Sequence, residues 1–191
     1  LEAGRVLALT APDIVNAASG EIVATDARII ATGNLTNHGL IDGTYVRVEA
    51  GNTLTNHGRI YGDELALSAV TLDNHNAIAA RWSLNIGAGT LVNHPGAELF
   101  SLGELRIGGT LDANRRASGS ATTVTNHGAR IEALGNLRID AGAINNRNIG
   151  YSTQLQTVGT ETIAINNVPG TATWLPDSEV AFQDQPDNYG K

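Results

Sequence analysis

The chain has 191 residues, with 12 Lys and Arg against 19 Asp and Glu, a net charge of -7, 4% aromatic residues and no Cys. Such a chain lacks the basic stripe and stacking rings that bind nucleic acid, and without Cys it forms no disulfide or thiolate metal site. Its 41% hydrophobic content is too high for intrinsic disorder, and no apolar run approaches the ~18 residues of a membrane-spanning helix. We therefore predict a folded chain with no nucleic-acid partner and no integral membrane segment.

Apolar residues alternate with other residues in short triplets, which is typical of β-strands. Seven such triplets recur along the chain: Leu7–Leu9, Ala27–Ile29, Val46–Val48, Leu65–Leu67, Leu84–Ile86, Leu105–Ile107 and Leu137–Ile139. Their centres are 20, 19, 19, 19, 21 and 32 residues apart. The sequence thus predicts one repeated strand and very little helix.

Every His in the chain follows an Asn, and these pairs form a second column with the same period. They are Asn37-His38, Asn56-His57, Asn74-His75, Asn93-His94 and Asn126-His127. Successive histidines are 19, 18, 19 and 33 residues apart, so the last interval predicts a loop insertion near residues 112–123. Apolar residues precede the Asn by two (Leu35, Leu54, Leu72, Leu91, Val124) or follow it by four or five (Ile41, Ile60, Ile78, Ile131), whereas Pro95 shifts Leu99 out of this pattern.

A unit of this size cannot bury its apolar residues alone, but stacked copies can. Each strand would pair in parallel with its counterpart in the next coil, about 4.8 Å away. We predict an all-β fold over residues 1–149, a right-handed parallel β-helix of about seven coils of ~19–21 residues. A β-propeller is the alternative, although its blades take twice this period. Triplet centres that would point outward need only be soluble: Arg28, Arg47, Asn85, Arg106 and Arg138.

The Asn column has two physical interpretations. Asn tolerates left-handed backbone angles at a turn, and the Gly that often follows would supply a positive φ. Stacked Asn amides can also bond to each other up the ladder. After Asn148 the pattern fades, and residues 150–191 are predicted to be an irregular tail, a cap or the start of the next domain, with Ile163–Asn167 interpreted as an irregular further coil.

Three stretches carry the full repeat: Gly33–Ile41, Thr53–Ile60 and Val124–Ala133. They resemble the repeats of filamentous haemagglutinins and of contact-dependent growth inhibition exoproteins, the secreted partners of two-partner secretion systems. Two further stretches, Leu102–Asp112 and Ala143–Asn148, are similar to the end of the first repeat region in the inhibition exoproteins. The resemblance covers about residues 4–149.

The resemblance implies a structural stalk, secreted to the bacterial cell surface, that presents a receptor-binding or toxin region to neighbouring cells. It implies two partners: an outer-membrane two-partner secretion transporter, acting through the parent protein, and a receptor on a target cell. Because the chain begins with Leu1, we expect a segment of a longer protein whose secretion and toxin domains lie outside it. The alternatives are an adhesin segment that binds glycan or protein directly, and a β-helical polysaccharide-cleaving enzyme.

The His column is the sharpest candidate for chemistry, because stacked imidazoles can bind metal ions. The column lacks a regular carboxylate partner, however, and a turn position chosen for its geometry is the favoured interpretation. Arg115 and Arg116 are expected to be a solvated pair in the loop.

Carboxylates and aromatic residues are the other candidates. The carboxylates Glu49, Asp63, Glu64, Glu98, Glu104, Glu132 and Asp140 fall at different offsets from the repeat Asn, unlike the converging acids of glycosidic catalysis. The aromatic residues Tyr45, Tyr61, Trp82 and Phe100 share no single offset either, and are expected to pack against the rod. We predict no enzymatic activity, no catalytic, cofactor or metal site and no cofactor, and we assign no binding residues.

Overall fold

The computed structural model describes residues 1–148, 153, 159, 165–167, 170 and 172–176. These residues form β-strands and no helix. Accordingly, the described part of the chain holds no helix with the length and apolar character to traverse a bilayer. The chain divides into two compact units, Leu1–Tyr151 and Ser152–Lys191.

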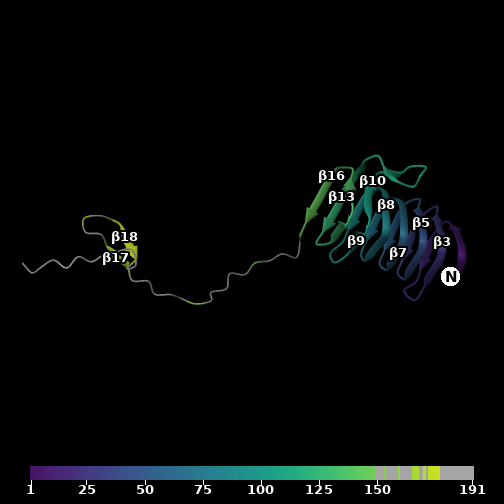
Figure 1. The fold of residues 1–191 in the computed structure, drawn as a ribbon, viewed down its shortest axis with the longest axis horizontal. Coiled ribbons are helices and arrows are strands. Elements are labelled where there is room, and N and C mark those ends of the chain that lie inside the picture. Colours follow the sequence, from purple (N-terminus) through teal and green to yellow (C-terminus); the bar gives the residue numbers. More distant parts are fainter. Residues whose placement is uncertain (149–152, 154–158, 160–164, 168–169, 171, 177–191) are drawn as a thin grey trace, which may run out of the picture. The chain divides into compact units, whose positions relative to one another are not determined.

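The first unit is a solenoid of parallel strands with about eight turns, shown in Figure 1. Its strands are β1 (Glu2–Ala11), β2 (Ile14–Asn16), β3 (Glu21–Ala31), β4 (Leu35–Asn37), β5 (Leu40–Ala50), β6 (Thr53–Asn56), β7 (Arg59–Asn74), β8 (Ala77–Asn93), β9 (Glu98–Ser101), β10 (Glu104–Gly108), β11 (Thr110–Leu111), β12 (Ala117–Ser118), β13 (Ala121–His127), β14 (Arg130–Ala133), β15 (Leu137–Ile139) and β16 (Ala141–Arg147). The all-β, parallel solenoid that the sequence predicted is confirmed, and the number of turns is close to the predicted seven.

The repeat period sets the register of the strands. All seven predicted triplets lie side by side in parallel strands, so that Leu7, Ala27, Val46, Leu65, Leu84, Leu105 and Leu137 form one continuous column. The column of Ile41, Ile60 and Ile78 continues through Leu99 to Ile131. Leu99 therefore keeps its place in the stack, because the turn at Pro95 and Gly96 takes up the extra residues.

The apolar columns fill the interior of the solenoid. Leu35, Leu54, Leu72 and Leu91 are each 0% exposed, as are the isoleucines at 41, 60 and 78. Burial of such side chains is the main favourable term in folding. In the last coil, Leu137 continues the column of Leu105, and Ile144 continues the column of Leu91 and Val124. These two side chains are 46% and 54% exposed.

A ladder of asparagine side chains runs along one edge of the core. Each Nδ2 donates to the Oδ1 of the next rung at 2.8–2.9 Å, through Asn16, Asn37, Asn56, Asn74, Asn93, Asn126 and Asn146. Four of these rungs, from Asn37 to Asn93, are 0% exposed. The predicted amide stacking is thus confirmed, and the ladder gains two members, Asn16 and Asn146, that no His follows.

The interpretation of the Asn-His-Gly turn as left-handed backbone is wrong for most of the column. Among the described residues, Arg115 is the only non-Gly residue with a positive φ, 61°. Gly128 does have a positive φ of 58°, but Gly39 and Gly58 do not. They are required because a Cβ would lie 2.0 Å from the Gly20 carbonyl oxygen and 2.1 Å from that of Gly39, respectively.

The predicted insertion near residues 112–123 starts inside a short antiparallel hairpin, whose strands are β11, just before the insertion, and β12. The last residues of the insertion belong to β13. The backbone N–H of Ala117 donates to Asn85 Oδ1 at 3.2 Å. The hairpin therefore covers Asn85, which is 7% exposed rather than a freely solvated outward residue as expected. The other triplet centres predicted to point outward, Arg28, Arg47, Arg106 and Arg138, are half-buried or exposed.

In the second unit, β17 (Ile165–Asn167) pairs with β18 (Trp174–Pro176) in antiparallel orientation. The described part of Ile163–Asn167, interpreted from the sequence as an irregular further coil, is thus one strand of an antiparallel pair. Ile163, Ala164 and most of the predicted tail lie outside the described residues.

Candidate functional site

Four imidazoles stack on the surface beside the Asn ladder. Ring centroids are 5.0 Å apart for His38 and His57, 4.4 Å for His57 and His75, and 3.9 Å for His75 and His94. Each His follows a ladder Asn, and its backbone N–H donates to an Asn carbonyl of the preceding coil at 2.7–2.9 Å. The rings thus repeat at about one strand spacing. His127 follows the insertion and lies in β13, in register with Arg147.

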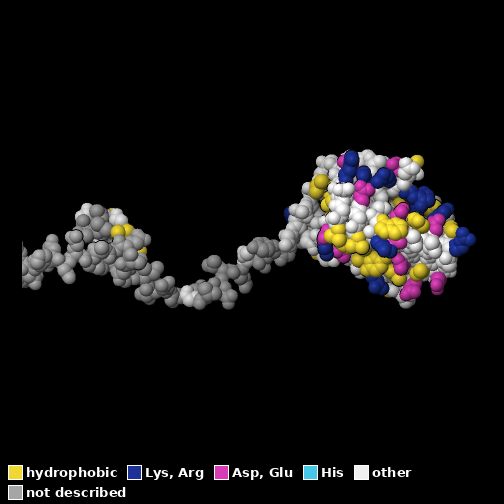
Figure 2. All heavy atoms as spheres, viewed as in Figure 1, with side chains coloured by type: hydrophobic (Ala, Val, Ile, Leu, Met, Phe, Trp, Pro, Cys, Tyr) yellow, Lys and Arg dark blue, Asp and Glu magenta, His cyan; other side chains and the backbone are white. Residues whose placement is uncertain are grey.

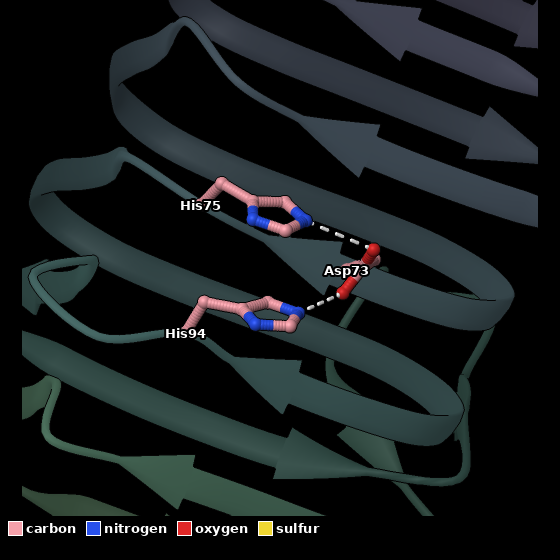
Figure 3. Close-up of side chains that lie close together, drawn as sticks. All are labelled: Asp73, His75 and His94. Atoms are coloured by element: carbon pink, nitrogen blue, oxygen red, sulfur yellow. Dashed lines mark hydrogen bonds and ion pairs between the residues drawn. The ribbon is translucent and has the colours of Figure 1, made fainter. Parts of the chain in front are cut away.

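Asp73 joins the last two imidazoles of the stack, as Figure 3 shows. Its Oδ2 lies 3.0 Å from His75 Nε2, and its Oδ1 lies 2.5 Å from His94 Nε2. Asp73 was not among the carboxylates singled out from the sequence. It lies one residue before the repeat Asn, where the aligned residues are Thr36, Thr55, Asp73, Val92 and Thr125, so a carboxylate occurs once among them.

The environment shifts two pKa values in this group. Burial lowers the pKa of the His57 imidazole below its ordinary value, and the neighbouring charges of His75 and His38 lower it further. Partial burial alone would raise the pKa of Asp73, but its hydrogen bonds with His75 and His94 outweigh burial and lower it. The stack therefore resists protonation at His57 while holding a carboxylate ionised two residues before His75.

We expect the chain to lose stability as the pH falls below the unfolded His value of 6.5. Because the folded pKa of His57 is the lower one, the unfolded chain binds more protons there, and protonation favours unfolding. Urea midpoints measured with a chelator between about pH 7 and pH 5 check this, since that range brackets the unfolded imidazole. The variant His57→Gln should give a flatter profile; a profile as steep as that of the original chain would contradict the assignment. Carboxylates with a lowered pKa, such as Asp73, affect the free energy of unfolding at a lower pH than this range.

The repeats identify the family. A family model described as "Haemagglutinin repeat" matches residues 1–39 and 40–167. The chain belongs to the haemagglutinin repeat family. Comparison with curated proteins and with solved structures gave no match. The coils that carry the Asn ladder are thus haemagglutinin repeats. The cluster of Asp73, His75 and His94 lies on two neighbouring coils of this series.

Most carboxylates singled out in these haemagglutinin repeats form ion pairs with Arg. The pairs are Glu49 with Arg47, Glu98 and Glu132 with Arg130, Glu104 with Arg106 and Arg116, and Asp140 with Arg138. In Arg47–Glu49, Arg106–Glu104 and Arg130–Glu132 the partners are two residues apart on one strand, where side chains share a face. Asp140 follows directly after the end of β15, which carries Arg138. Hydrogen bonds from Arg106 lower the pKa of Glu104, and Arg116 adds to this effect. Arg116, expected to be solvated with Arg115, is thus also paired.

Two of the aromatic residues share a column after all. Tyr61, Ala79 and Phe100 lie in register on β7, β8 and β9. The turn at Pro95 and Gly96 hid this alignment, because it places Phe100 two residues further from its Asn. Tyr61 and Phe100 line a shallow groove of about 710 Å³, together with Asp42, Asp63 and Arg81. On the face shown in Figure 2, hydrophobic side chains gather over β7 and β9.

The other two aromatic residues were expected to pack against the rod, but they are exposed. Tyr45 is 42% exposed and Trp82 is 49% exposed. The Arg81 guanidinium lies 5.7 Å from the centroid of the Trp82 ring, which is within the range of a cation–π contact.

Proposed function

We propose that this chain is a structural stalk segment of a large secreted bacterial surface exoprotein, which presents a receptor-binding or toxin region to neighbouring cells. The observation that carries the proposal is the unbroken stacking of core and Asn ladder through successive coils. Each coil contacts mainly its neighbours, so the stack makes a rod whose length depends on the number of repeats. The exposed Leu137 and Ile144 of the last coil offer a surface on which a further coil or a cap can pack.

The same proposal extends to partners and location. Members of the haemagglutinin repeat family are typically secreted surface proteins. We propose export through an outer-membrane two-partner secretion transporter that acts on the parent protein, and contact with a receptor on a target cell, as in contact-dependent growth inhibition. The carboxylates support a non-enzymatic role, because most of those singled out are held in ion pairs with Arg.

A replacement experiment tests the stalk function. In the parent exoprotein, residues 1–148 are exchanged for an equal number of coils from an unrelated parallel β-helix. A stalk contributes length and stiffness, so the chimera should still reach the cell surface and should retain target-cell binding or inhibition. Immunogold labelling checks display, and a competition assay with target cells checks delivery. Display without any target-cell effect would contradict the stalk function.

A direct adhesin is the second candidate, and the groove of Tyr61 and Phe100 favours it. Two aromatic rings on one face, with the small Ala79 between them, suit stacking against sugar rings, and nearby carboxylates can accept hydroxyl hydrogen bonds. A glycan array with the purified chain tests this candidate. Binding that Tyr61→Ala abolishes and Tyr45→Ala leaves intact would support it, because Tyr45 is exposed outside the groove.

A further inference from the structure

We infer that Asp73, His75 and His94 form a binding site for a divalent transition-metal ion of the Zn²⁺ type. One ligand atom from each residue lies within 4.8 Å of the others. In the part of the chain that the structure describes, this is the one such group of three or more potential ligands. The expectation of no metal site rested on a His column without a carboxylate, and Asp73 supplies one. The inference is independent of the stalk function.

The donor atoms suit this class of ion. Two imidazole nitrogens and one carboxylate oxygen are a common zinc ligand set, which leaves a fourth position for water or for a group on another molecule. Tetrahedral ligands at ~2.0–2.2 Å from zinc lie roughly 3.3 Å apart. His75 Nε2 lies 3.0 Å from Asp73 Oδ2, His94 Nε2 lies 2.5 Å from Asp73 Oδ1, and the three donor atoms all lie within 4.8 Å of one another. Shifts of about 1–2 Å between donors therefore bring them to the spacing of zinc ligands.

The backbone beneath the site is already fixed. Asn74 lies between Asp73 and His75, is 0% exposed, and donates through Nδ2 to Asn93 Oδ1 at 2.8 Å. Its carbonyl oxygen accepts the backbone N–H of His94 at 2.9 Å. The Asn ladder thus holds all three ligands on adjacent coils before any ion binds, and such preorganisation favours binding.

The two imidazole rings must also change their orientation. The rings of His75 and His94 are nearly parallel, with an interplanar angle of 8°. An ion bound to both Nε2 atoms requires the rings to tilt toward a common point. Both imidazoles are partly exposed on the rod surface, so the tilt leaves the core columns unchanged.

The rest of the His ladder supplies the matched comparison. Thr36 and Thr55 occupy the position of Asp73 in the two preceding coils. The imidazoles of His38 and His57 therefore stack without a carboxylate at that position. Asp73→Thr converts the site into the side-chain pattern of those coils, so the variant is compatible with the fold.

Isothermal titration of the chelator-treated 191-residue chain with ZnCl₂ tests the inference. We expect one Zn²⁺ per chain and a rise in melting temperature with added ZnCl₂, because the ion binds the folded state. Asp73→Thr should weaken Zn²⁺ binding by more than about tenfold. The loss of a residue that only supports a metal ligand already lowers metal affinity by ~10–100-fold, and Asp73 is a ligand itself. With Cu²⁺ as a second probe, electron paramagnetic resonance should show coupling to two nitrogens.

The control variant is His38→Gln, which removes one imidazole of the stack without touching the three ligands. It should bind Zn²⁺ as the original chain does. Two results would overturn the inference: no binding of Zn²⁺ by the original chain, or an equal loss of affinity in His38→Gln and Asp73→Thr. The second result would mean that the stacked imidazoles bind metal without a defined site. Melting in the presence of chelator verifies that both variants are folded.

Discussion

Replacing Asn56 by Asp is expected to destabilise the solenoid by roughly 3–5 kcal/mol, although the two side chains have the same shape. Asn56 is 0% exposed. Its Oδ1 accepts from Asn37 Nδ2 at 2.9 Å, and its Nδ2 donates to Asn74 Oδ1 at 2.9 Å and to the Ala77 carbonyl oxygen at 3.3 Å. A carboxylate keeps the first bond but has no proton for the other two. Asn56→Asp therefore buries a charge that faces two acceptor oxygens.

The matched control is Asn52→Asp, which makes the same change of charge at an exposed turn position. It should cost less than about 0.5 kcal/mol. Urea denaturation of both variants at neutral pH measures the difference. Equal losses would contradict the role of the amide ladder.

The pH dependence of the Asn56→Asp penalty provides an independent check. Burial raises the folded pKa of the introduced carboxyl above its unfolded value of about 3.9. A group with a raised folded pKa contributes most to stability below the unfolded value, and that contribution is lost as the pH rises. The penalty relative to the original chain should therefore grow from about pH 4 toward neutrality. A constant penalty would mean that the carboxylate reaches solvent.

The regular columns could be predicted because stacking places like residues together. A period of 18–21 residues between triplets and between His residues determines which side chains share a column, and burial then follows from their apolar character. Asn16 escaped this reasoning because Ala17 follows it rather than His. Its place in the ladder depends on the register of β2 with β4, which only the assembled coils determine.

The candidate sites were harder to predict because they depend on departures from the repeat. Asp73 replaces a Thr of its column once, and a single substitution has no periodic signal. Tyr61 and Phe100 align only after the turn at Pro95 and Gly96 is counted as an insertion. The hairpin over Asn85 is likewise a local contact, set by the ends of the inserted loop rather than by the repeat. Contacts that occur in one coil only, or that depend on an inserted loop, are therefore not predicted by the periodicity of the sequence.

Leu54 represents the apolar ladder at the centre of the rod. It lies in register between Leu35 and Leu72, and all three are 0% exposed. Because the neighbouring coils are tied by strand pairing and by the Asn ladder, they have little freedom to close a cavity. The cost of shortening this side chain thus includes both the lost transfer free energy and the cavity that remains.

Leu54→Ala is expected to lower the free energy of unfolding by about 2–5 kcal/mol, whereas Leu134→Ala, at a position that is 64% exposed, should lower it by less than about 0.5 kcal/mol. Urea denaturation of the two variants measures the contrast. Stability in a solenoid is close to a sum of coil and interface terms. A weakened central interface should therefore also reduce cooperativity, which would appear as a smaller m-value or a second transition for Leu54→Ala alone. Equal losses in the two variants would refute the assignment of inward and outward faces, and an unchanged m-value would show that the rod unfolds as one cooperative unit.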